Sequence, residues 1–152
     1  MANWYGSARS NYVQVENMEA LKLALDPFLN EITIDDCGEK GVCFTAQCGE
    51  YGGWPTTVYV ETIYKEEENG PELEREDQLE FDPAIHIAPH LKEGQVLVMM
   101  ECGAEKLRYL TGWAQAYQAI TGDCVSVSMD DIYKKAALAF ETPENDISLA
   151  QY

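Results

Sequence analysis

The sequence predicts an α+β protein with a single, mostly antiparallel sheet of about six strands and two helices on one face. Short segments with alternating apolar residues recur along the chain, while apolar residues three and four apart occur in only two stretches. The 152 residues are 46% hydrophobic, which suffices for one buried core without metal or disulfides. We expect residues 1–141 to form one domain with an acidic insertion at 61–82, and residues 142–152 to form a loosely attached tail.

The first third of the chain predicts a strand, a helix and two further strands. Residues 12–15 alternate as in a short strand, and Asn17 is a suitable N-cap for a helix with apolar residues on one side over 18–25. Residues 31–36 and 42–46 alternate again, with glycines between them that indicate a turn. This order predicts a β-α-β-β opening.

The middle of the chain predicts a strand over 57–63 that runs directly into the acidic insertion. Asn69-Gly70-Pro71 indicates a turn there, and residues 72–79 are compatible with a short helix. Residues 81–91 contain two prolines and predict an irregular segment or a single helical turn.

The last third predicts a hairpin and a helix. Residues 95–102 are apolar at nearly every position, which is typical of a central strand covered on both faces. Residues 107–119 and 124–127 are expected to be strands joined by a turn at 121–123. A capping-box pattern at Ser128 and Asp131 then predicts a last helix that ends before Pro143.

Composition excludes several classes of protein. The net charge of −17 makes direct binding to nucleic acid or to an anionic membrane unfavourable, because both require basic residues. No apolar stretch is long enough to span a membrane, and the first residues have no signal-peptide core. Five cysteines without paired spacing indicate free thiols in a reducing compartment. We therefore expect a cytoplasmic protein.

No motif for catalysis or cofactor binding is present. The chain has no nucleophile elbow and no phosphate-binding loop, so we expect neither an enzyme nor a cofactor. His86 and His90 are four residues apart, as in some zinc sites, but Pro89 between them disfavours a shared helix. We expect no metal, with a metal-dependent enzyme as the least favoured alternative.

The acidic insertion is the strongest functional signal. It holds ten carboxylates and two basic residues, about half of the excess charge in about one seventh of the length. One interpretation is a solvated loop, and the other is a surface that imitates the charge of a nucleic-acid backbone toward a basic partner. In the second case the charged face comprises Glu66, Glu67, Glu68, Glu72, Glu74, Glu76, Asp77 and Glu80.

Three sequence segments carry a resemblance. Ser7-Ala8-Arg9-Ser10-Asn11-Tyr12, the Gly52-Gly53-Trp54-Pro55 turn and the Glu105-Lys106-Leu107-Arg108-Tyr109-Leu110-Thr111-Gly112 segment resemble small uncharacterised proteins of bacteriophages and mobile elements. By setting, such proteins are similar to anti-CRISPR and anti-restriction inhibitors. The resemblance implies a non-enzymatic inhibitor whose partner is a basic nucleic-acid-binding protein or nuclease complex of the host.

A second class of function remains open. Trp4, Tyr5 and Trp54 are residue types that anchor protein interfaces, so the chain is alternatively an interaction or assembly module with an aromatic surface. A homodimer is compatible with either class. High salt separates them, because it weakens charge-driven binding and leaves an apolar interface intact.

Overall fold

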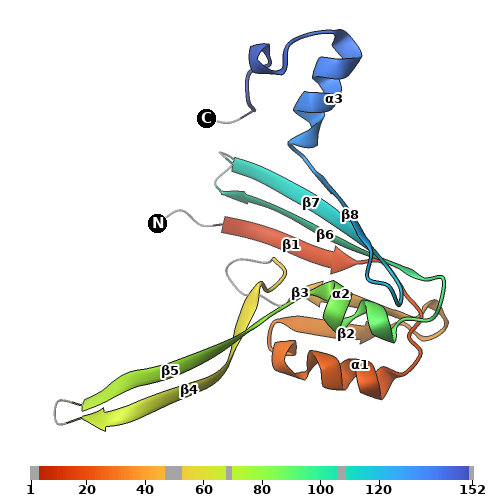
Figure 1. The fold of residues 1–152 in the computed structure, drawn as a ribbon. Coiled ribbons are helices and arrows are strands. Elements are labelled where there is room, and N and C mark those ends of the chain that lie inside the picture. Colours follow the sequence, from red (N-terminus) through yellow and green to blue (C-terminus); the bar gives the residue numbers. More distant parts are fainter. Residues whose placement is uncertain (1–3, 47–52, 68–69, 106–108, 151–152) are drawn as a thin grey trace.

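The computed structural model describes residues 4–46, 53–67, 70–105 and 109–150 (Figure 1). A six-stranded antiparallel sheet has the order β2-β3-β1-β6-β7-β8, and β4 and β5 form a separate two-stranded sheet. This architecture confirms the predicted α+β class. The strands are β1 (Trp4–Ser10), β2 (Ile32–Asp36), β3 (Val42–Ala46), β4 (Thr57–Glu67), β5 (Gly70–Glu80), β6 (Val96–Glu105), β7 (Tyr109–Gln118) and β8 (Cys124–Ser128).

Short helices connect the strands. The α-helices are α1 (Met18–Leu25), α2 (Pro83–His86) and α3 (Asp131–Phe140), and the 3-10 turns are η1 (Asp26–Phe28), η2 (Gly38–Lys40), η3 (Ala88–His90) and η4 (Glu144–Asp146). The predicted Asn17 cap is present, since its side chain accepts hydrogen bonds from the backbone N–H groups of Glu19 and Ala20. The described helices include none that is long and apolar enough to cross a bilayer.

One strand that the sequence did not reveal is β1, near the centre of the six-stranded sheet. It pairs with β6 from Trp4 opposite Glu105 to Ser10 opposite Met99, and also contacts β3. The prediction of a strand at residues 12–15 was wrong, because Val13 and Val15 make only isolated bridges. Those bridges join the end of β1 to the body of the domain.

One face of the sheet is covered and holds the core. Leu21 and Leu25 of α1 are fully buried, and they share a cluster with Phe44 of β3, Leu97 of β6 and Ile87 after α2. Helices α1 and α2 lie on this side (Figure 1). Of the two helices predicted to pack on one face, only α1 does so, and the short α2 lies beside it in place of the last helix.

The opposite face is open over β6 and β8. Met100 is 58% exposed and Val125 is 72% exposed. The expectation that the 95–102 segment is covered on both faces was therefore wrong for its outer face. The last helix forms as predicted, but α3 lies beyond the sheet (Figure 1) and none of its residues is buried. Its Tyr133 hydroxyl accepts a hydrogen bond from the backbone N–H of Ala150 in the tail, at 2.7 Å.

Candidate partner-binding site

The acidic insertion is an extended β-hairpin, here called the acidic arm (Thr57–Glu80). Strands β4 and β5 contain 11 residues each, and a rise of about 3.4 Å per residue makes the arm roughly 35 Å long. Figure 1 shows the arm leaving the body of the protein at an angle to the six-stranded sheet. The prediction of a short helix over 72–79 was wrong, because these residues pair with β4.

Two irregularities interrupt the ladder of the arm. The register shifts between Tyr59 and Glu61 and again between Ile63 and Tyr64. Such bulges increase the local twist of a hairpin and disfavour its pairing with other edges. The register also places Glu61 directly opposite Asp77, a pair of like charges that weakens the arm.

Apolar residues at its base attach the arm to the core. Val58 and Phe81 are 9% and 8% exposed, and the Phe81 N–H donates to the carbonyl oxygen of Thr56 at 2.8 Å. The Phe81 ring lies edge-on to Phe28, with centroids 5.1 Å apart, and stacks on His86 at 6.0 Å. The base of the arm is therefore part of the core, while the rest extends into solvent.

The predicted acidic face is distributed over both strands. Glu76 and Glu80 are exposed and Asp77 is half-buried, all on β5. Glu66 and Glu67 belong to β4, and Glu72 and Glu74 belong to β5, with their side chains outside the described part; Glu68 lies outside the described residues. Because successive strand residues point to opposite sides, Glu76 and Glu80 lie on one side of the arm and Asp77 lies on the other, so the predicted residues do not form a single face. Exposed Glu61 of β4, which the sequence prediction did not include, lies opposite Asp77. The position of Glu61 in the same acidic run of the sequence was the signal that could have included it in the prediction.

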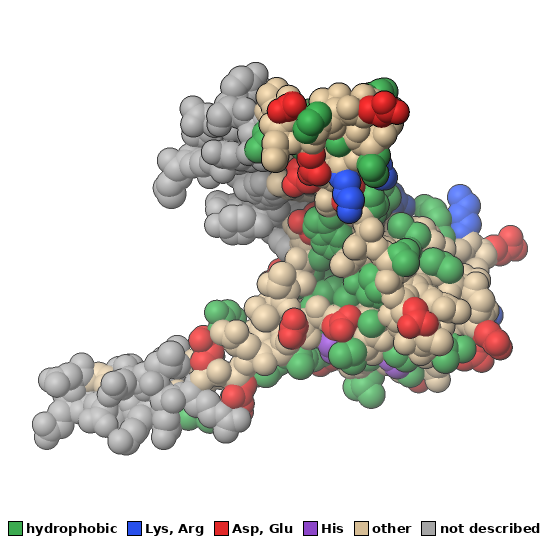
Figure 2. Space-filling view, turned by 45° about the horizontal axis from the view of Figure 1, so that its top comes forward, with side chains coloured by type: hydrophobic (Ala, Val, Ile, Leu, Met, Phe, Trp, Pro, Cys, Tyr) green, Lys and Arg blue, Asp and Glu red, His purple; other side chains and the backbone are tan. Residues whose placement is uncertain are grey.

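The charge density of the arm is closer to that of one nucleic-acid strand than to that of a duplex. Residues 57–80 contain nine carboxylates and two basic residues, a net charge of −7. Over roughly 35 Å this is about one net charge per 5 Å, compared with about 3.4 Å for a single DNA strand and 1.7 Å for the duplex axis. In Figure 2 the described part of the arm shows acidic side chains, whereas the visible Lys and Arg side chains lie on the body.

The described residues do not show the aromatic surface that was predicted as an alternative binding site. Trp54 is only 8% exposed, and its Nε1 donates to the carbonyl oxygen of Met100 at 3.2 Å. The side chains of Trp4 and Tyr5 lie outside the described part. Trp54 instead lies beside the base of the arm, where it lines a cavity.

The histidines and the described cysteines belong to other elements than the arm. His86 belongs to α2, where its Nδ1 is 2.9 Å from the carbonyl oxygen of Asp82, and His90 belongs to η3. Within the described ranges, no three His, Cys, Asp or Glu side chains come together as a metal site would require. Cys102 and Cys124 are exposed thiols.

Comparisons with protein-family models, with curated proteins and with solved structures find no match to this chain. The arm is thus the feature from which a function has to be argued. The charged side chains that the structure describes on the arm are carboxylates. A surface that is complementary to it in charge carries basic residues.

Proposed function

We propose that this protein is a non-enzymatic inhibitor that inserts its acidic arm into the basic nucleic-acid-binding surface of a bacterial defence complex. The observation that supports this most directly is the arm itself, a hairpin with a net charge of −7 whose base is held in the core. A charged segment attached in this way loses less conformational entropy on binding than a free loop does. The arm thus combines long reach with a defined orientation.

The length and charge of the arm favour a narrow channel as its binding site. A two-stranded hairpin roughly 35 Å long matches about ten nucleotides of one strand in its stacked, helical form, at about 3.4 Å per charge. Its net charge is lower than that of such a strand, so the arm competes through pre-organisation as well as through charge. A groove that holds single-stranded DNA or RNA fits these dimensions better than a surface that holds a duplex.

The setting of the proposal comes from the resemblance to phage and mobile-element proteins. An accessory protein of that origin meets restriction and CRISPR nucleases in the host cytoplasm, and both have basic nucleic-acid channels. We propose this partner class on the combination of that resemblance with the acidic arm.

The proposal is tested by expressing the chain in bacteria that carry a defined restriction or CRISPR nuclease and counting plaques of a targeted phage. We expect wild-type protein to raise plating efficiency for at least one nuclease. The triple variant Glu66→Gln, Glu67→Gln, Glu68→Gln should lose most of this effect, because it removes three consecutive charges from the acidic run of the sequence. The purified nuclease then serves for a competition assay against labelled DNA at 50 and 200 mM NaCl, where binding should weaken about tenfold or more.

A matched control removes three charges elsewhere. Glu141→Gln, Glu144→Gln, Asp146→Asn changes the net charge equally, and all three side chains are exposed near α3. The control should inhibit as wild type does. Equal activity of both triple variants would contradict a role for the arm, and lack of protection against every nuclease tested would contradict the class of function.

The open apolar surface favours a second function, an assembly module. Val125 and Val127 on β8 are 72% and 44% exposed, and Leu138 and Phe140 on α3 are both 75% exposed. Exposed apolar side chains that gather in a patch are typical of protein interfaces. Light scattering across a concentration series at 50 and 500 mM NaCl tests it: a dimer that persists in high salt and dissociates in Val125→Asp supports this function, and a monomer throughout excludes self-assembly.

A further inference from the structure

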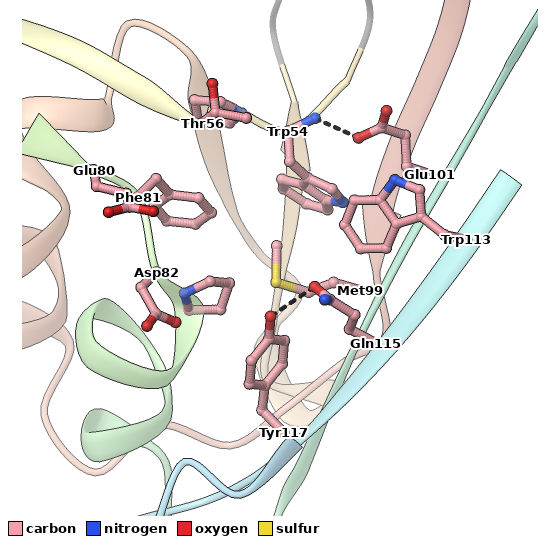
Figure 3. Close-up of a pocket in the computed structure, with 12 residues that line it drawn as sticks. Trp54, Thr56, Glu80, Phe81, Asp82, Met99, Glu101, Trp113, Gln115 and Tyr117 are labelled. Carbon is pink, nitrogen blue, oxygen red and sulfur yellow. Dashed lines mark hydrogen bonds between the residues drawn. The ribbon is translucent and has the colours of Figure 1, made fainter. Parts of the chain in front are cut away.

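A cavity of about 380 Å³ lies between the base of the acidic arm and the covered face of the sheet. We call it the arm-base pocket. Strands β6 and β7 form one side, and the residues before β4 and after β5 form the other (Figure 3). It is lined by Trp54, Pro55, Thr56, Glu80, Phe81, Asp82, Pro83, Met99, Glu101, Trp113, Gln115 and Tyr117.

Aromatic rings form much of the wall. Figure 3 shows Phe81 on one side of the pocket and Trp113 and Tyr117 on the other, with Trp54 between the two sides. Hydrogen bonds hold several of these groups in place. The backbone N–H of Trp54 donates to Glu101 Oε2 at 2.9 Å, and the Tyr117 hydroxyl donates to Gln115 Oε1 at 2.7 Å. The wall is thus pre-formed, as ligand sites usually are.

The charged groups of the pocket are acidic. Glu80, Asp82 and Glu101 line it, and none of the described lining residues is a Lys or Arg. Burial raises the pKa of Tyr117, so this phenol stays neutral and the carboxylates supply the charge. Aromatic faces and carboxylates both attract cations, and in combination they exclude anions.

The shape and the acceptors of the pocket identify which cation fits. A guanidinium group is flat and stacks on an indole face, and its five N–H groups are donors suited to carboxylates and to the Gln115 amide oxygen. A quaternary ammonium has no donor for these acceptors. The volume lies near the lower end of the range for small-molecule sites, which suits one side chain.

We propose that the arm-base pocket binds the guanidinium group of an arginine side chain presented by a basic partner. The inference rests on the proposed function for the source of the arginine, because the pocket lies at the root of the arm that would enter the partner. An arginine bound there anchors the base of the arm while its acidic strands occupy the channel. The acidic arm thereby acquires a specific contact in addition to its diffuse charge.

The test uses small probes, so that it does not depend on a partner. N-acetyl-arginine methylamide is titrated into the full chain while the indole N–H signals of Trp54 and Trp113 are followed by NMR. We expect saturable shifts of these signals. The citrulline analogue, which has the same shape without the charge, should bind at least about tenfold more weakly, as should the trimethyl-lysine analogue.

Glu101→Gln is the decisive variant. It removes the charge but keeps a side-chain oxygen that can accept the hydrogen bond from the backbone N–H of Trp54, so the pocket wall is retained. We expect arginine binding about tenfold weaker, with an unchanged melting temperature. Glu93→Gln, which removes one exposed carboxylate outside the pocket, should bind arginine as wild type does.

Three outcomes would overturn the inference: no shift with the arginine probe, equal binding of citrulline, or stronger binding of trimethyl-lysine. The triple variant of Glu66, Glu67 and Glu68 separates this inference from the proposed function. If the protein binds arginine but the triple variant inhibits as wild type does, the pocket proposal is supported and the proposal of nucleic-acid mimicry is contradicted. If inhibition requires the arm charges but the protein does not bind arginine, mimicry is supported and the pocket proposal is contradicted.

Discussion

The acidic arm and the C-terminal end, comprising β8 and α3, both extend from the core, but water is a good solvent for only one of them. The arm exposes carboxylates such as Glu61 and Glu76, whereas the C-terminal end exposes apolar side chains such as Val125 and Phe140. Water solvates exposed charged groups well, so they need no partner, whereas contact of a large apolar surface with water is unfavourable in free energy. The two regions therefore differ in what they expose: the arm presents charge to solvent, and the C-terminal end presents apolar surface of the kind that interfaces bury.

The acidic arm and α3 also differ in how they are attached to the core. The arm ends in buried aromatic residues that belong to the core, while α3 has no buried residue and is joined to the sheet through Met129, whose N–H donates to Gly112 at 2.8 Å. Loss of a residue at the root of the arm should therefore affect the whole domain, and changes in α3 should not. Three substitutions test this contrast, in order of decreasing effect.

Phe81→Ala should lower the free energy of unfolding by about 3–5 kcal/mol, because it removes a buried ring that packs against Phe28 and His86. Urea unfolding followed by circular dichroism measures this. Tyr59→Ala on the arm is the control, since Tyr59 is 63% exposed and should change stability by less than about 0.5 kcal/mol. A loss below about 1 kcal/mol for Phe81→Ala would mean that the arm is not anchored in the core.

Glu61→Lys should raise stability by roughly 0.2–1 kcal/mol, because it converts a like-charge pair with Asp77 into an attractive one. Thermal unfolding at 20 and 500 mM NaCl measures the effect, which should shrink at the higher salt concentration. Glu61→Gln separates loss of repulsion from gain of attraction and should lie between wild type and the lysine variant. No change at low salt would contradict the pairing of these two positions.

Phe140→Ser should change stability by less than about 0.5 kcal/mol, since Phe140 is 75% exposed. The same denaturation measurement at low protein concentration tests this, with Leu25→Ala as the contrasting buried truncation, for which about 2–5 kcal/mol is expected. A large loss for Phe140→Ser that grows with protein concentration would show that α3 is covered in an oligomer. That result would favour the assembly function.

Local patterns were sufficient for some elements and not for others. Helix α1 has its own cap and apolar stripe, so its ends were predictable from Asn17 to Leu25. Strand β1 contains Gly6, Ser7 and Ala8, which have weak strand preference, and it is a strand because β3 and β6 pair with both of its edges. Glu and Leu residues favour a helix over 72–79, yet pairing with β4 overrides that preference.

The candidate site was predictable in part for the same reason. The acidic run and the turn near Gly70 are local features, and they indicated a charged, divided segment. That this segment is a hairpin anchored through Val58 and Phe81 depends on contacts between distant residues. The arm-base pocket unites Trp54, Glu101 and Trp113, which are too far apart in sequence to form a motif.

Composition and short-range periodicity thus established the α+β class, the first helix, the hairpin near the C-terminal end and the concentration of charge, because each follows from neighbouring residues. The three-dimensional contacts decided which sheet face is covered, that the acid forms an arm, and that aromatic and acidic side chains meet at its base. Pairing partners and burial are long-range properties that local preferences do not encode.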